Sequence, residues 1–166
     1  MARLTVVGAR AVERLIAAAA SGSDIAARAA AWRTLEAIGD ERAREPALQA
    51  LADLNVDPSL GVAAADVARV YLRGTHGATT LDRLTAVLLD PIRPDAVRLA
   101  ALRALRALGP GTIAPILASL AGDPSATIRR SSGSGTASPD RLNAWRSAPG
   151  SSGRPRSAAR LTAAAG

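Results

Sequence analysis

Apolar residues recur along most of this chain at the spacing of one face of an α-helix. The first such stripe consists of Val12, Leu15, Ile16 and Ala19. This i, i+3, i+4, i+7 spacing places the side chains on one side of a helix, and the alternation typical of strands is absent. Glycine near the ends of the apolar runs and Asp-Pro or Pro-Asp pairs near their starts are ordinary helix boundary signals. The pattern predicts helices with short connections at about residues 9–20, 24–38, 42–54, 59–73, 79–89, 95–108 and 111–121.

Two stretches of the chain repeat one pattern. Residues 8–15 (GARAVERL) and 77–84 (GATTLDRL) both read Gly, three residues, an apolar residue, an acid, Arg and Leu. The second stretch begins 69 positions after the first, and Pro46 and Pro115 are separated by the same interval. Such periodicity is typical of repeat architectures, and short connections make consecutive helices antiparallel neighbours. The sequence therefore predicts an all-α array of helix pairs.

Three segments of the chain resemble parts of the HEAT repeat, in the short bacterial form that is also found in PBS-lyase-type proteins. Residues 123–129 (DPSATIR) resemble the start of that repeat's first helix, and residues 57–63 do so except that Ala63 replaces the arginine. Residues 8–16 resemble the second helix. The resemblance covers roughly residues 4–130. It implies a right-handed α-α superhelix, a HEAT-like solenoid of about three and a half helix pairs.

The resemblance also implies a role for Arg28, Arg98 and Arg129, which stand at the family's ladder position. There an arginine pairs with an acid of the adjacent repeat and stiffens the stack. Ala63 interrupts this ladder, so we expect a looser junction at that repeat.

The composition divides the chain into two parts. Residues 1–130 hold 16 arginines and 13 acids and form the predicted repeat domain. Residues 131–166 are rich in Ser, Gly, Pro, Ala and Arg, and cannot bury enough apolar surface to offset the entropy of ordering. We therefore expect a disordered tail, for which a translated frameshift is one hypothesis. Because the repeats begin on a second helix and end as a new first helix starts, a fragment of a larger repeat protein is also expected.

The inventory of reactive residues argues against an enzyme. The chain has no cysteine, which excludes disulfides, thiolate catalysis and zinc sites that need sulfur. His76 is the only histidine and lies in a glycine-containing segment that we interpret as an exposed turn rather than an anion-binding nest. No serine lies in a nucleophile-elbow context. We expect no catalytic residues, no cofactor and no metal.

The same sequence contains no segment that suggests a membrane or secreted protein. The longest apolar run, residues 15–20, is far shorter than the ~20 residues that span a bilayer. Arginine and glutamate interrupt the beginning of the chain, so no secretory signal is predicted. We expect a cytoplasmic protein without membrane contact.

Charged pairs recur on the predicted second helices. They are Glu13, Arg14, Arg44, Glu45, Asp82 and Arg83. In a HEAT-like solenoid the second helices line the concave face, so these six residues are the candidate partner-binding residues of a mixed-charge groove. A solvated helix face would show the same pattern. The leading hypothesis is a non-enzymatic scaffold that binds a protein or peptide along this face.

Two alternatives remain open at the level of sequence. One is nucleic-acid binding of the HEAT-like DNA-repair type, for which Arg103 and Arg106, with Arg98, could form a local basic patch. This alternative lacks aromatic residues for base stacking, because Trp32 and Tyr71 lie on apolar stripes and are predicted to be core. The other is a truncated piece of a larger HEAT-repeat protein.

Overall fold

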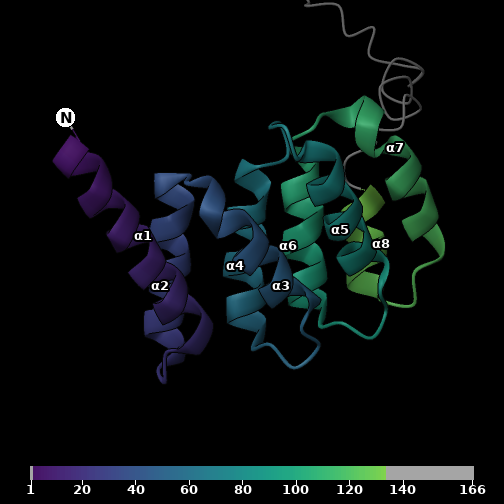
Figure 1. The fold of residues 1–166 in the computed structure, drawn as a ribbon. Coiled ribbons are helices and arrows are strands. Elements are labelled where there is room, and N and C mark those ends of the chain that lie inside the picture. Colours follow the sequence, from purple (N-terminus) through teal and green to yellow (C-terminus); the bar gives the residue numbers. More distant parts are fainter. Residues whose placement is uncertain (1, 134–166) are drawn as a thin grey trace, which may run out of the picture. The chain divides into compact units, whose positions relative to one another are not determined.

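The computed structural model describes residues 2–133, and their side chains from Gly8 onward; the regular secondary structure of this part of the chain is all helix, without strands (Figure 1). Its helices are α1 (Ala2–Ser21), α2 (Ile25–Ile38), α3 (Arg44–Ala52), α4 (Pro58–Val70), α5 (Gly77–Leu89), α6 (Asp95–Arg106), α7 (Pro110–Ser119) and α8 (Ala126–Gly133). Short 3-10 turns, η1 (Glu41–Ala43) and η2 (Leu120–Gly122), precede α3 and follow α7. The all-α prediction is confirmed. The predicted boundary after residue 130 falls inside α8, and the rest of the predicted tail lies outside the described residues.

Local signals account for the helix boundaries. The carboxylate of Asp24 accepts hydrogen bonds from the backbone N–H groups of Ala26 and Ala27, both at 3.1 Å, and so caps the start of α2. Gly39 ends the same helix at φ 66°, a left-handed conformation that glycine adopts without steric cost. Asp57 likewise caps α4, and Pro58 occupies its first turn.

The helices form two rows (Figure 1). In the even row, α2, α4, α6 and α8 lie side by side and each packs against the next. In the odd row, α1, α3 and α5 pack on α2, α4 and α6 respectively, and they touch one another less extensively. α7 contacts α6 and α8. Consecutive helices of the chain thus alternate between rows.

Alanine fills much of the contact between neighbouring helices of the even row. Ala64 and Ala68 of α4 and Ala101 and Ala104 of α6 are fully buried. Such small side chains let helix backbones approach closely, but each buries little apolar area. The few large buried side chains therefore carry a disproportionate share of the hydrophobic stabilisation. Trp32 and Tyr71 are both buried, as predicted.

Arginine side chains reach from the even row to the last carbonyl groups of the odd-row helices. Arg28 of α2 donates from Nε to the carbonyl of Ala19 and from Nη2 to that of Ala20, both at 2.9 Å, at the end of α1. Arg98 of α6 donates from Nε to the carbonyl of Leu88 at 2.9 Å, at the end of α5. The last carbonyls of a helix lack hydrogen-bond donors within the helix and carry partial negative charge. A guanidinium group supplies both the donors and the opposite charge.

Arg98 also pairs with Asp123, an acid in the segment that precedes α8. Its side chain is 1% exposed, and its two terminal nitrogens bind the two carboxylate oxygens of Asp123, with Nη1–Oδ1 at 3.1 Å. These hydrogen bonds lower the pKa of Asp123. Arg28 and Arg129 behave differently, because their hydrogen bonds go to backbone carbonyls rather than to acids.

In α4 a glycine stands at the position that corresponds to Arg28 of α2 and Arg98 of α6. Arg28 and Arg98 each stand four residues after their N-cap residue, and in α4, capped by Asp57, that position is Gly61 rather than Ala63. A Cβ atom at Gly61 would lie 2.8 Å from a methyl carbon of Val97. The close packing of α4 on α6 therefore leaves no room for an arginine there.

Arg93, in the loop between α5 and α6, supplies the missing guanidinium. Its terminal nitrogens donate to the carbonyls of Leu51 and Ala52 at the end of α3, the second at 3.0 Å. Its Nε lies 3.2 Å from Oδ2 of Asp90. Arg93 thus links the end of α3 to the loop between α5 and α6.

Replacement of Trp32 by alanine should remove the largest buried side chain. We expect Trp32→Ala to lower the free energy of unfolding by about 3–5 kcal/mol, measured by urea denaturation. Ile92→Ala is the control: Ile92 is 80% exposed, so its loss should change stability by no more than about 0.5 kcal/mol. Equal stability of the two variants would contradict the core position of Trp32.

Replacement of Arg93 should loosen the end of α3. Arg93→Ala leaves the carbonyls of Leu51 and Ala52 without their charged donor, and we expect a loss of about 1–3 kcal/mol together with faster hydrogen exchange in the last turn of α3. Arg93→Lys should not restore the wild type, because one ammonium group cannot bridge two carbonyls and a carboxylate. Arg33→Ala, which removes an exposed arginine bonded only to its own helix, is the control.

The pair formed by Arg98 and Asp123 should make stability depend on pH. Because the pKa of Asp123 is lowered in the folded state, its contribution is complete above the ordinary carboxyl value of about 4 and is lost as the pH falls through its depressed folded value. Asp123→Asn should therefore cost about 3 kcal/mol at pH 7, and the gap from the wild type should shrink in acid. Denaturation curves between pH 7 and pH 2 measure this. Asp82→Asn, which removes an exposed carboxylate, is the control. An equal loss of unfolding free energy in this variant would contradict the assignment of the pH dependence to the pair of Arg98 and Asp123.

Candidate functional site

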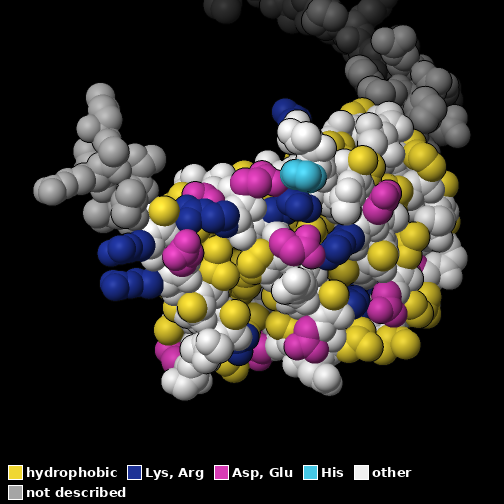
Figure 2. All heavy atoms as spheres, in the orientation of Figure 1, with side chains coloured by type: hydrophobic (Ala, Val, Ile, Leu, Met, Phe, Trp, Pro, Cys, Tyr) yellow, Lys and Arg dark blue, Asp and Glu magenta, His cyan; other side chains and the backbone are white. Residues whose placement is uncertain are grey.

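The six candidate residues all lie on the odd row. Glu13 and Arg14 belong to α1, Arg44 and Glu45 to the first turn of α3, and Asp82 and Arg83 to α5. Figure 2 shows acidic and basic side chains interspersed with apolar ones over this face.

The structure joins Arg83 to Glu45. The Nη1 atom of Arg83 lies 2.9 Å from Oε1 of Glu45, so an ion pair connects α5 to α3. Both side chains are more than two-fifths exposed, and such a pair contributes little to stability. Arg44 lies 3.8 Å from Glu45 and 3.0 Å from Glu41, measured between nitrogen and oxygen. These four residues form a connected group of alternating charge.

Glu13 has a partner that the sequence analysis missed. The Nη1 atom of Arg42, in η1, lies 3.4 Å from Oε1 of Glu13. Arg42 also binds both carboxylate oxygens of Asp40, and these hydrogen bonds lower the pKa of Asp40 to about 2. No periodic signal marks Arg42, because it lies in a turn between two helices.

Arg14 and Asp82 are not joined to the other candidates. Both side chains are exposed, and neither forms an ion pair or a side-chain hydrogen bond with the part of the chain that the structure describes. A partner could therefore bind these two charges without breaking an ion pair or side-chain hydrogen bond of the described residues.

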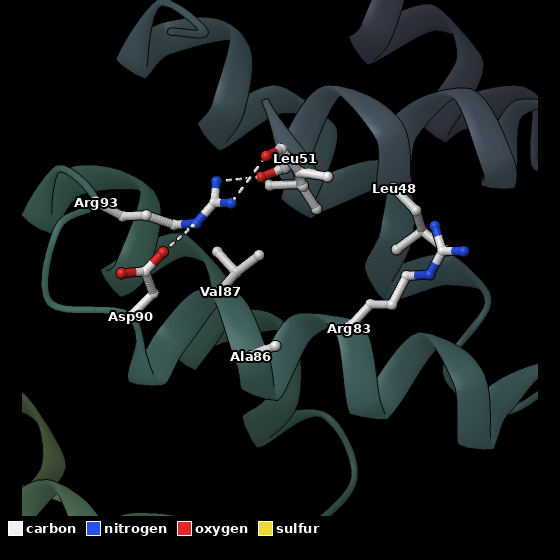
Figure 3. Close-up of a pocket in the computed structure, with 8 residues that line it drawn as sticks. Leu48, Leu51, Arg83, Ala86, Val87, Asp90 and Arg93 are labelled. Atoms are coloured by element: carbon white, nitrogen blue, oxygen red, sulfur yellow. Dashed lines mark hydrogen bonds and ion pairs between the residues drawn. The ribbon is translucent and has the colours of Figure 1, made fainter. Parts of the chain in front are cut away.

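A pocket of about 190 Å³ opens between α3 and α5 (Figure 3). Its apolar walls come from Leu48, Leu51, Ala52, Ala86 and Val87, and its polar rim from Arg83, Asp90 and Arg93. The pocket lies beside the ion pair of Arg83 with Glu45, on the row that carries the six candidates. Sequence reasoning did not find it, because its two walls are more than thirty residues apart in the chain and meet only when α3 lies beside α5.

The rim of this pocket is charged but internally compensated. Arg93 is held by Asp90 and by the carbonyls at the end of α3, and Figure 3 shows these contacts beside the pocket. Arg83 remains 44% exposed. The described residues of the lining include no serine, threonine, cysteine or histidine. The arrangement can hold an apolar side chain and hydrogen-bond a polar group at the rim.

His76 lies at a helix boundary rather than in this pocket. It is the N-cap residue of α5, and its Nε2 atom is 3.9 Å from Oε1 of Glu41. The glycine that follows has a packing reason, because a Cβ atom at Gly77 would lie 2.4 Å from the carbonyl oxygen of Leu72. The turn thus requires glycine without any bound anion.

Two features are absent from the described residues. Residues 2–133 contain no group of three or more histidine, cysteine or acidic side chains placed to hold a metal ion. None of the helices in this range is both long enough and apolar enough to cross a bilayer.

Comparison with protein-family models, with curated proteins and with solved structures finds no match for this chain.

Proposed function

We propose that this protein is a non-enzymatic interaction scaffold of the cytoplasm, a HEAT-like right-handed solenoid of about three and a half helix pairs. The partner is a protein or peptide that lies along the odd row. Support comes from the repeated motifs in the sequence and from the alternation of consecutive helices between two rows.

The observation that carries the proposal is the apolar pocket beside the charged group on α3 and α5. Its volume of about 190 Å³ is below the 300–1,000 Å³ typical of small-molecule and cofactor sites. The pocket suits a single aliphatic side chain of a larger partner. An apolar anchor in a pocket with charged groups at its edge is the usual arrangement of a protein interaction hot spot.

The neighbouring charges define what else the partner carries. Arg14 and Asp82 are exposed without partners among the described residues, and Arg83 is only partly satisfied by Glu45. A segment with an apolar anchor flanked by both an acid and a base complements this face. Such pairing at the rim contributes to specificity and to the association rate more than to affinity.

The charge distribution on this row favours a protein over nucleic acid. Arg42, Arg44 and Arg83 all form ion pairs with acids. A phosphate backbone would have to displace these acids and would then lie against them. Nucleic-acid binding and a truncated repeat fragment remain the alternatives that the experiment below separates.

The test is capture of a partner from source lysate, with and without nuclease treatment, with the full chain as bait. Ala86→Leu places a larger side chain into the wall of the pocket, and we expect it to reduce capture at least tenfold, as should Arg83→Glu. Ala78→Leu, on the same helix but outside the pocket, should capture normally. Thermal melting of each variant checks that the fold is intact.

Three other outcomes would count against the scaffold. Equal capture by Ala86→Leu and Ala78→Leu would remove the pocket from the interface. Capture that nuclease abolishes would favour nucleic acid, and no capture by the intact chain would favour a fragment.

A further inference from the structure

A second groove lies on the even row, away from the site proposed above. It has a volume of about 430 Å³ and is lined by apolar side chains of α4 and α6 together with two arginines of α6. The apolar members are Val62, Ala96, Leu99 and Leu102. The two arginines are Arg103 and Arg106, and Ser131 of α8 also lines the groove.

Arg106 is incompletely satisfied. It donates from Nη2 to the backbone carbonyl of Ser131. Its Nε atom is buried and has no hydrogen-bond partner among the described residues. Buried polar groups almost always have a partner, and a guanidinium held only by a neutral carbonyl lacks the opposite charge that usually accompanies it. The groove therefore contains a guanidinium group that has neither an acceptor for its Nε–H nor an acidic partner among the described residues.

Arg103 adds a second cation one helical turn earlier. Its side chain is exposed, and it forms no ion pair or hydrogen bond with the described residues. Residues three apart on a helix are neighbours on its surface, so two like charges here repel one another. The basic patch suggested by the sequence is thus reduced to these two residues, because Arg98 is buried against Asp123.

No acid of the described residues forms an ion pair with Arg103 or Arg106. Arg69 and Glu36 on the same row neutralise one another through an ion pair of 2.6 Å. Asp66 of α4 is close enough to interact electrostatically with Arg103, but it makes no hydrogen bond to either arginine.

We propose that this groove binds an acidic peptide segment of a partner protein, in which an aspartate or glutamate side chain lies between Arg103 and Arg106 and an adjacent aliphatic side chain contacts Val62 and Leu99. A carboxylate supplies the planar acceptor that guanidinium groups bind best. The apolar walls favour a peptide over a phosphate, since nucleic acid would require a longer basic stripe. The protein thus has a second docking surface on the row opposite to the proposed scaffold face.

The test is a titration of the full ¹⁵N-labelled chain, followed by NMR at the arginine Nε–H groups. The probe is an acetylated, amidated pentapeptide of alternating leucine and glutamate, and the comparison is the same peptide with glutamine. We expect saturable binding of the glutamate peptide, with the largest shifts at Arg103 and Arg106. Arg103→Gln and Arg106→Gln should each weaken binding at least tenfold.

Arg33→Gln is the matched control, because it removes one positive charge from the even row outside the groove. The affinity of Arg33→Gln for the glutamate peptide should stay within twofold of the wild type. The same is expected of Arg83→Glu, which changes a charge on the odd row and so tests whether the peptide binds there instead. Equal binding of the glutamine peptide, equal loss in Arg33→Gln, or displacement of the peptide by inorganic phosphate at lower concentration would overturn the proposal. If Arg106→Gln has a lower melting temperature than the wild type, the result is taken from Arg103→Gln, because Arg103 is exposed and its replacement should leave the fold intact.

Discussion

The contact between arginine guanidinium groups and the final carbonyls of the odd-row helices is the constraint on which the rest of this structure depends. The even-row interfaces are rich in alanine and bury little apolar area at each contact. Directional hydrogen bonds therefore have to fix the position of one row of helices relative to the other. Arg28, Arg93 and Arg98 do this for α1, α3 and α5 in turn. The Arg98 bond to Asp123 extends the same link to the segment that precedes α8.

The same packing explains where the pocket on the odd row comes from. α3 is the shortest helix of its row and ends at Ala52, where Arg93 holds its last carbonyls. Ala52 and Ala86 line the space that remains between α3 and α5, and neither can fill it. The guanidinium that closes the end of α3 therefore also forms one side of the pocket, so stability and the proposed binding site share a residue.

The two faces differ in how their charges are balanced. On the odd row most arginines meet acids within the chain, and a partner would gain mainly from the apolar pocket. On the even row Arg106 lacks an acid and Arg103 is exposed, so a partner would gain from neutralising charge. The two proposed surfaces therefore recognise different chemistry and lie on different rows of helices.

The sequence by itself determined the helices and much of their ends, because caps and apolar stripes act within one or two turns. Asp24, Gly39 and Asp57 are sufficient to locate their boundaries. It also identified the six charged candidates, but not their pairing. Tertiary structure alone decided that Gly61 packs closely against Val97, that Arg93 reaches the end of α3, and that Arg42 meets Glu13. Each of these depends on which helices lie side by side, and local sequence patterns carry no information about contacts between residues far apart in the chain.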